Sequence, residues 1–417
     1  MPRKNPAELE IDLFVSGVRL DPSSGLDDTM EFNRTRAGLG SGIEAIIPGD
    51  PKDIWMNIPA REKFAKNSPY LLKKSGEGFV VEDRRDDESY EIRLRPRPQW
   101  YDRKTASGKP MARIAVMQGT YLGVYIGETC DFWREKPSTR CRFCTTGVNV
   151  GKYEEEEKHV SDVIEVANAA KVENKISFVH FNSGFHLNAG VEIVAPYVKA
   201  VKEQVGAMVG VQLAPDHDFW KYDQLIDMGV EHFSFCYEFH NPEYFREYLP
   251  GKEKHLSRRL YFDALEYTSR KLGKGRCSGE IIAGIEPIQD TLDAIDYITS
   301  VGAFPTVCIF RPLVDADLEA APSPQYRDML AVFQYMIESC RKNSVPIGLA
   351  PNLEVSLVVL PTDALYLAPQ TSDFSWYKAR LAVLKTMARP YFGWRMRKHK
   401  IGSRGDKLLA LNEARSR

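Results

Sequence analysis

The sequence predicts an α/β protein: a parallel β/α barrel, full or nearly full, preceded by a β-containing extension. Two observations predict this fold. From about residue 113, apolar runs typical of strands alternate with stretches in which apolar residues recur every three or four positions. Several of these stretches end in a glycine, as a helix C-cap often does: Gly229, Gly273 and Gly302. Repeated strand–helix units require parallel strands joined by crossovers, which is how a β/α barrel is built.

Eight segments have the composition of strands, and eight is the number in a closed TIM-like barrel. In chain order they are residues 113–127, 176–182, 207–214, 232–238, 278–284, 306–312, 345–351 and 355–361. Helical patterns fall between most of them, at residues 160–171, 190–204, 222–229, 260–273, 291–302 and 326–342. In such barrels the chemistry lies at the C-terminal ends of the strands, so residues at strand exits are the site candidates.

The chain divides into three parts by composition. Residues 1–112 are rich in Pro, Gly and charge, and we interpret their short strand-like runs as an N-terminal extension with some β structure. Residues 113–362 form the predicted barrel, and residues 363–417 a C-terminal helix and a basic, aromatic tail. We interpret the tail as a packed helix with a solvated end, because one basic tail on a neutral chain is a poor footprint for nucleic acid.

Composition and charge narrow the class of protein. Of the 417 residues, 43% are hydrophobic and 27% are charged, as in an ordinary soluble globular protein. The formal net charge is -1, so no global field attracts nucleic acid or an anionic membrane, and we expect neither as a partner. No signal peptide or membrane-spanning run is visible, which predicts a cytoplasmic location. The oligomeric state stays open.

Three of the seven cysteines lie together, just after the first predicted strand. Ten residues separate Cys130 from Cys141, and two separate Cys141 from Cys144. Thiolates are the ligands of iron–sulfur clusters, and three of them would leave one iron of a cubane free to bind a substrate or cofactor. The alternatives are a zinc site completed by a histidine such as His159, or ordinary thiols. The position at a strand exit favours the iron–sulfur cluster, with these three cysteines as metal ligands and catalytic residues.

The run Cys141-Arg142-Phe143-Cys144 resembles the Cys-x-aromatic-Cys pair of the radical S-adenosylmethionine (SAM) superfamily, whose members carry three cysteines after the first barrel strand. The resemblance implies a 4Fe-4S cluster and SAM as cofactors. The first gap in the superfamily is usually three residues and here it is ten, so the cluster motif is an atypical CX10CX2C.

The fourth predicted strand and its exit resemble the biotin-synthase-like branch, particularly its hydrogenase-maturase and methylornithine-synthase members. The resemblance implies that Glu238 binds the amino group and ribose of SAM and that Arg258 or Arg259 binds the carboxylate, since an acid and a guanidinium suit a zwitterion. The alternative for Glu238 is a structural ion pair inside the barrel. The other cofactor contacts that we expect are Phe143, Asn182, Ser183, Gly184, Gln212 and Ile285.

Cys236, Cys277 and Cys308 fall on three successive predicted strands, and biotin synthase holds a second cluster inside its barrel. Because side chains alternate along a strand, Cys236 shares a face with Glu238, whereas Cys277 and Glu280 oppose each other. No CxxC pair occurs among the three, and buried cysteines often have no function, so core packing is the alternative.

The resemblance implies an enzyme that cleaves SAM reductively and uses the 5′-deoxyadenosyl radical to take a hydrogen atom from its substrate. We expect a small polar substrate in cofactor or natural-product biosynthesis, because polar residues stand at the predicted strand exits. An electron donor such as flavodoxin or ferredoxin is implied as a partner. The alternatives are a sulfur-inserting enzyme with a second cluster, a zinc-binding barrel protein and an iron–sulfur carrier.

Overall fold

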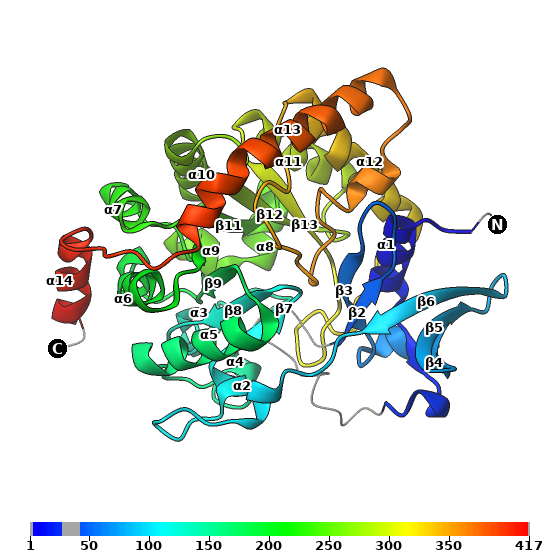
Figure 1. Cartoon of the computed structure of the whole chain (residues 1–417), viewed down its shortest axis with the longest axis horizontal. Helices are drawn as coiled ribbons and strands as arrows, with labels where there is room; N and C mark the ends of the chain where they lie inside the picture. The colour runs from blue at the N-terminus through cyan, green and yellow to red at the C-terminus, as the bar shows by residue number, and fades with distance from the viewer. Residues whose placement is uncertain (1–2, 27–41, 416–417) are drawn as a thin grey trace.

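The computed structural model describes residues 3–26 and 42–415, and Figure 1 shows two β-sheets with helices around the larger one. In the described residues the smaller sheet has six strands. Their order is β1 (Arg19–Leu20), β4 (Tyr70–Ser75), β5 (Gly78–Asp83), β6 (Glu88–Leu94), β2 (Gly42–Ile47) and β3 (Ile54–Pro59). This sheet belongs to the N-terminal extension.

The larger sheet is curled and has seven strands within the described ranges. Their order is β13 (Phe304–Ile309), β12 (Cys277–Ala283), β11 (His232–Glu238), β10 (Met208–Gln212), β9 (Phe178–Asn182), β8 (Tyr121–Tyr125) and β7 (Val116–Gln118). From β8 to β13 every neighbouring pair is parallel, and β7 pairs antiparallel with β8 at the edge.

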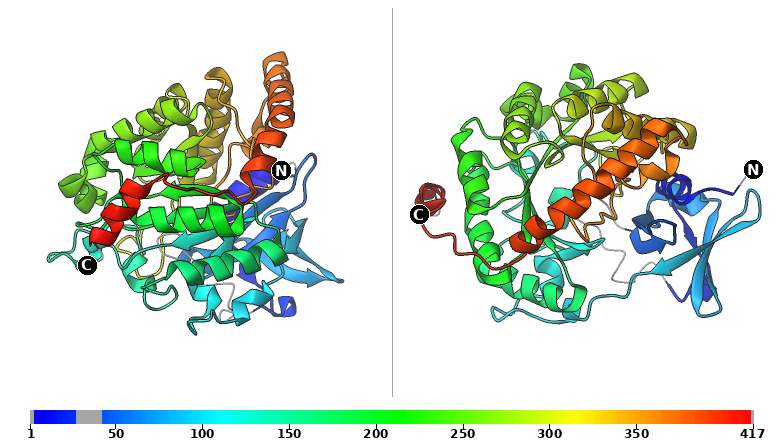
Figure 2. Two further views of the ribbon diagram at one scale, coloured as in Figure 1. Left: turned by 60° about the vertical axis from the view of Figure 1, so that its left-hand side comes forward. Right: turned by 45° about the horizontal axis from the view of Figure 1, so that its top comes forward.

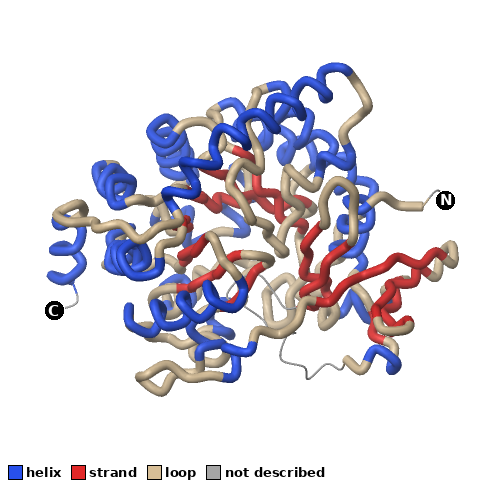
Figure 3. The backbone as a smooth tube through the Cα atoms, viewed as in Figure 1, coloured by secondary structure: helices blue, strands red, loops and turns tan. Residues whose placement is uncertain are grey.

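Helices connect the parallel strands and cover the outer side of this sheet, as the two further views in Figure 2 and the tube in Figure 3 make plain. The helices up to α7 are α1 (Pro6–Ser16), α2 (Met111–Ile114), α3 (Asp131–Arg134), α4 (Thr146–Asn149), α5 (Val160–Asn174), α6 (Ala195–Ala200) and α7 (Trp220–Met228). The later ones are α8 (Pro242–Tyr248), α9 (Pro250–His255), α10 (Arg258–Leu272), α11 (Ile288–Ser300), α12 (Tyr326–Lys342), α13 (Ser372–Arg395) and α14 (Asp406–Arg415).

The closed barrel of eight strands is the part of the fold prediction that the structure corrects. The predicted strands at residues 345–351 and 355–361 are loops, tied to β13 by one isolated bridge between Val307 and Val359. The first of them carries two prolines, which lack the amide that a strand ladder needs. Gly348 also has φ +62°, outside the β region. The sheet is therefore a partial barrel, and the loop at residues 345–361 lies along its open side.

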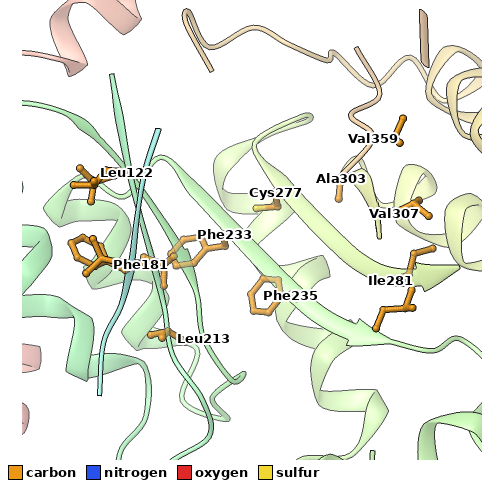
Figure 4. Packing of buried hydrophobic residues seen from close by; sticks show 14 of the residues in the cluster. Leu122, Phe181, Leu213, Phe233, Phe235, Cys277, Ile281, Ala303, Val307 and Val359 are labelled. Atoms are coloured by element: carbon orange, nitrogen blue, oxygen red, sulfur yellow. The ribbon is translucent and has the colours of Figure 1, made fainter. Parts of the chain in front are cut away.

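Alternation along the strands separates a helix-covered outer face from the barrel interior. Phe233 and Phe235 point outward from β11, and Tyr222 of α7 meets them edge-on at ring-centroid distances of 5.5 and 6.0 Å (Figure 4). Burying each of these phenylalanines contributes about 1.5–3 kcal/mol. Ser234, which lies between them, faces the interior instead. The interior is where the polar side chains collect.

The N-terminal extension begins with a helix that the composition argument missed. Asn5 caps α1 by accepting from the N–H groups of Ala7 and Glu8, while the Glu8 carboxylate accepts from the Asn5 N–H at 2.8 Å. The motif Asn5-Pro-Ala-Glu8 is a capping box with proline at the first helical position, so the signal was present in the sequence. The helix packs on β3 and brings Phe14 to the mouth of the partial barrel.

Candidate active site

A cavity of about 220 Å³ opens at the C-terminal ends of the parallel strands, where β/α barrels carry their chemistry. Its walls come from the strand ends, from the loop after β8 and, through Phe14, from α1. Five of the seven cysteines line it: Cys130, Cys141, Cys144, Cys236 and Cys308. The three from the loop after β8 are those predicted to hold a cluster.

The exit of β9 positions Cys130. The N–H of Phe185 donates to the sulfur of Cys130 at 3.3 Å, and the N–H of Gly184 donates to the Tyr125 hydroxyl at 3.1 Å. A Cβ added at Gly184 would lie 2.4 Å from the Cβ of Cys130. Gly184 is therefore needed for the close approach of two chain segments, which is a structural reason for its place beside the cysteine.

The ten residues between Cys130 and Cys141 form a folded arm, which we call the α3 arm (residues 131–140). Helix α3 opens it, and the chain then turns back so that the Thr139 N–H donates to the Phe132 carbonyl at 2.9 Å. The Gly251 N–H of α9 donates to the Thr139 carbonyl at 2.9 Å, and His255 meets Glu135 at 2.5 Å. The atypical spacing is thus accommodated by docking on α9, and the three cysteines still reach one cavity.

The thiols are held in a poorly solvated place. Burial raises the pKa of Cys130 to about 11 and raises the pKa of Cys141 well above its usual value. Such thiols stay protonated at neutral pH unless a metal stabilises the thiolate. The Thr146 N–H donates to the Cys144 sulfur at 3.4 Å, as the Phe185 N–H does to Cys130. N–H donors to sulfur are among the features that tune iron–sulfur clusters.

Three thiolates that line one cavity are the kind of ligand set that an iron–sulfur cluster needs. In a cubane each thiolate binds a different iron, so the sulfurs stand further apart than the ligands of one metal ion. Across residues 3–26 and 42–415, no three His, Cys, Asp or Glu side chains are grouped closely enough to hold one ion. His159, the histidine considered for a zinc site, does not line the cavity; its side chain is 54% exposed, 3.7 Å from Glu157.

Glu238 ends β11 in a strained turn that points its side chain into the cavity. Its φ is +56°, and the Phe239 N–H donates to the Tyr237 carbonyl around it at 2.7 Å. A non-glycine residue in such a conformation costs about 1–3 kcal/mol. The register with β12 shifts at the same point, between Cys236 and Glu238, as bulges beside active sites do. Both residues consequently line the cavity.

The base that faces Glu238 is Lys252 of α9, which the sequence argument did not identify. Its ammonium pairs with the Glu238 carboxylate and donates to the Cys236 carbonyl at 2.6 Å. Burial raises the pKa of Glu238 to about 7 against the opposing effect of Lys252. Burial alone would lower the pKa of Lys252, but Glu238 and the tyrosine and thiols around it raise it well above its usual value.

The expected SAM contacts divide into two groups. Those that line the cavity with the three cysteines are Phe143, Asn182, Ser183, Gly184, Gln212 and Glu238. Those that do not line it are Arg258, Arg259 and Ile285. Arg259 is 72% exposed and pairs with Asp263 at 2.6 Å, while Arg258 donates to the His240 carbonyl. Both arginines open α10, where Arg258 is bonded just beyond the end of β11 and Arg259 faces solvent.

The three cysteines on β11, β12 and β13 lie in two different environments. Cys277 is fully buried on the outer face of β12 and packs toward α10, so it is removed from any site inside the barrel. Cys236 and Cys308 lie in the cavity on either side of Glu280. Gln212 donates to Cys236 at 2.5 Å and to Glu280 at 3.1 Å, and the Cys308 thiol lies 3.7 Å from Glu280. Burial raises the pKa of Glu280.

A second cavity of about 180 Å³ lies deeper in the barrel and shares a polar layer with the first: Asn182, Gln212 and Glu280. Its walls are largely aromatic and aliphatic, with His180 and His232 among them. Burial lowers the pKa of His180 to about 3 and that of His232 to about 4, so both imidazoles are neutral at pH 7. The buried atoms without a protein partner include His180 Nε2 and Asn182 Oδ1.

Comparison with known proteins gives one curated relative. No protein-family model matches the sequence. The bacteriochlorophyllide c C-7(1)-hydroxylase of Chlorobaculum limnaeum is 24% identical over 247 residues, which is 54% of this chain and 61% of the relative. The chain thus spans about three fifths of that relative's length. The relative is a hydroxylase, and therefore an enzyme.

Several solved structures are similar at low scores. SuiB of Streptococcus suis bound to S-adenosylmethionine has a TM-score of 0.40 and 10% identity, over 55% of this chain and 46% of that chain. Methylornithine synthase (PylB) has a TM-score of 0.40 and 15% identity, over 63% of this chain and 81% of that chain. A radical SAM methyltransferase from Sphaerobacter thermophilus has a TM-score of 0.41 and 11% identity, over 67% of this chain and 76% of that chain.

Proposed function

We propose that this protein is a radical SAM enzyme in which Cys130, Cys141 and Cys144 hold a 4Fe-4S cluster and SAM occupies the adjoining cavity. The observation that carries the proposal is the meeting of these three thiols with the Glu238–Lys252 pair in one cavity at the ends of parallel strands. The similarity to a hydroxylase is consistent with it.

The cluster would supply the electron that cleaves the sulfur–carbon bond of SAM. The protein's own groups would bind and orient the cofactor. SAM carries an ammonium and a carboxylate, and the Glu238–Lys252 pair offers one group of opposite charge to each. Glu238 would accept from the SAM ammonium, and Lys252 would donate to the SAM carboxylate. This gives Lys252 the part that the sequence argument assigned to Arg258 or Arg259.

We propose that the substrate lies beyond SAM, toward the polar layer of Asn182, Gln212 and Glu280. Their amide and carboxyl groups would fix a hydrogen-bonding group of a small molecule. The deeper cavity adds an apolar wall below this layer. Substrates that combine a polar group with a small apolar body therefore fit better than uniformly polar ones.

Anaerobic reconstitution with iron and sulfide tests the proposal. With SAM and a strong reductant, the wild-type protein should release 5′-deoxyadenosine, and Cys130→Ala, Cys141→Ala and Cys144→Ala should each lose cluster and product. Cys340→Ala is the matched control, because Cys340 is buried on α12 away from the cavity. A reconstituted protein with about four irons per chain that forms no 5′-deoxyadenosine would contradict the proposal.

Sulfur insertion remains a second candidate, favoured by one observation: Cys236 and Cys308 both line the cavity beside Glu280. A second cluster there would raise the iron content above about four per chain. The double variant Cys236→Ala/Cys308→Ala would then return it to about four while 5′-deoxyadenosine release persisted. Iron that stays near four in the wild type would exclude this candidate.

A further inference from the structure

The deeper cavity has the size and lining of a site for a small, largely apolar molecule. Its volume is about 180 Å³, and an apolar cavity of about 150 Å³ can hold a benzene molecule. The side chains of Phe178, Met208, Phe304, Leu349 and Leu353 are part of its wall. Such a wall favours binding because it removes the apolar surface of a ligand from water.

Two charged side chains line the cavity at the N-terminal ends of the strands, and both are bound by other parts of the protein. Lys202 donates to the Glu231 carboxylate at 2.6 Å, and Arg395 pairs with the same carboxylate. The Arg276 guanidinium donates to the Glu231 carbonyl at 3.1 Å and to the Tyr391 hydroxyl at 3.2 Å. An ionic ligand would have to displace one of these contacts and lose its own hydration, so a neutral molecule fits better.

Hydrogen bonding distinguishes the two neutral histidines of the cavity. His232 Nδ1 lies 3.0 Å from the Arg276 carbonyl, and because a carbonyl only accepts, Nδ1 carries the hydrogen. Its Nε2 is then an acceptor, and the Ser278 hydroxyl can donate to it at 3.3 Å. His180 Nε2, in contrast, is buried without a protein partner. Nearly all buried polar atoms are hydrogen-bonded, so an unpaired one in a cavity wall indicates the place of a bound molecule.

The position of His180 suits contact with a molecule of this size. It lies two residues before Asn182 on the same face of β9, so it stands about 6.6 Å deeper than the polar layer, which is the length of a small ring. Its neighbour on β10 is Gly210. A Cβ there would lie 2.7 Å from His180 Cδ2 and closer still to the Phe178 ring. The missing side chain therefore leaves room for both rings in the barrel interior.

We infer that the deeper cavity binds the body of the substrate, an uncharged molecule about the size of one aromatic ring, and that His180 selects for a hydroxyl group on it. A hydroxyl both donates and accepts, so it can bond Nε2 in either tautomer of His180. The identification of this molecule as the substrate rests on the proposed function, whereas the site itself does not. His180 is then a specificity-determining residue in addition to the three groups of the polar layer.

Calorimetry of the intact protein with phenol and toluene tests the inference. The two probes are similar in size, and only phenol has a hydroxyl. Phenol should bind about tenfold more tightly than toluene, which is the effect of one buried hydrogen bond. Excess SAM on the reconstituted protein should leave this preference unchanged, because His180 does not line the cavity proposed for SAM. His180→Phe should bind toluene as the wild type does but should lose the preference for phenol.

The matched control is His232→Phe, which makes the same substitution in the same cavity at a ring whose nitrogens already have protein partners. It should keep the preference for phenol and melt at a lower temperature, because Arg276 and Ser278 each lose a partner. A wild type that binds neither probe, or both equally, would overturn the inference. So would a preference for phenol that survives in His180→Phe, or one that is lost equally in both variants. A phenol preference without release of 5′-deoxyadenosine would contradict only the proposed function.

Discussion

At the scale of single residues, the most informative contact is the buried pair of Glu238 and Lys252. An isolated buried charge is expensive, and each member of the pair offsets part of that cost for the other. The strained turn at Glu238 costs about 1–3 kcal/mol more, and no structural contact explains why the strain is kept. Strain of this kind persists where the surrounding structure holds a side chain for function, which supports a binding role for Glu238.

Glu238→Gln should weaken SAM binding by about 10- to 100-fold, because it removes one charge-assisted hydrogen bond. Iron content after reconstitution should stay at the wild-type value, since Glu238 is not proposed as a ligand. Equilibrium binding of SAM to the reconstituted protein measures the effect. Arg259→Gln is the control and should bind SAM normally, because Arg259 is exposed and pairs with Asp263. Equal weakening in both variants would mean that an arginine at the start of α10 binds the SAM carboxylate.

The neutral histidines in the deeper cavity give the protein a defined acid sensitivity. The pKa of His180 is lowered from about 6.5 to about 3, first by burial and then by His232. His180 therefore binds a proton below about pH 6.5 in the unfolded chain, but only below about pH 3 in the folded protein. Stability that is complete above pH 6.5 is lost as the pH falls through this window.

His180→Phe should reduce that loss. Each such histidine removes about 1.4 kcal/mol per pH unit below 6.5, so about 2 kcal/mol at pH 5. Urea unfolding at pH 7.5 and pH 5 should show a difference smaller by about 2 kcal/mol in the variant than in the wild type. Phenylalanine keeps the aromatic contacts with Phe178 and Tyr121. An unchanged difference would mean that His180 accepts its proton in the folded protein.

At the scale of elements, the α3 arm explains how an atypical cysteine spacing is accommodated. The arm folds back on itself and docks on α9 through Gly251 and His255, and its Phe132 lines the cavity. The same helix carries Lys252, so α9 supports both the cysteine loop and the proposed SAM contact. Cluster retention and SAM binding should consequently depend on this one short helix.

Gly251→Ala should disturb that docking. The new Cβ would lie 2.5 Å from the Phe132 ring and 2.7 Å from the Thr139 carbonyl, so the arm must move. Overpacking of this kind costs about 1–3 kcal/mol, and we expect a lower melting temperature and less iron per chain after reconstitution. Gly393→Ala is the control, because nothing lies within 4 Å of the added Cβ and α13 should tolerate it. Full iron retention in Gly251→Ala would show that the arm does not position the cysteines.

At the scale of the whole molecule, the N-terminal sheet and the partial barrel are joined beside the cavity by Arg311. Its guanidinium donates to the Asn57 carbonyl at 2.9 Å and lies 3.7 Å from the buried Glu62 carboxylate. The arginine is itself a cavity-lining residue. The extension whose role the sequence did not reveal thus forms part of the wall of the candidate active site.

Arg311→Met should destabilise the protein by about 3–5 kcal/mol, because it leaves the Glu62 carboxylate buried without its cation. Urea unfolding measures the loss. Arg93→Met is the control: it breaks an exposed pair with Asp53, 50% and 40% exposed, and should cost no more than about 1 kcal/mol. Similar small costs in both variants would mean that the two sheets are held together elsewhere.

The sequence by itself determined the alternation of strands and helices from β8 to α12 and the grouping of three cysteines after the first barrel strand. Those signals are local, since periodicity and motif spacing act within a few turns of chain. The tertiary structure decided the rest. It left the last two predicted strands as loops, because their prolines and a positive φ oppose a ladder. It placed Lys252 and not Arg259 beside Glu238, and Cys308 but not Cys277 in the cavity. These placements depend on how helices pack against strands that are distant in the chain, and local sequence patterns do not contain that information.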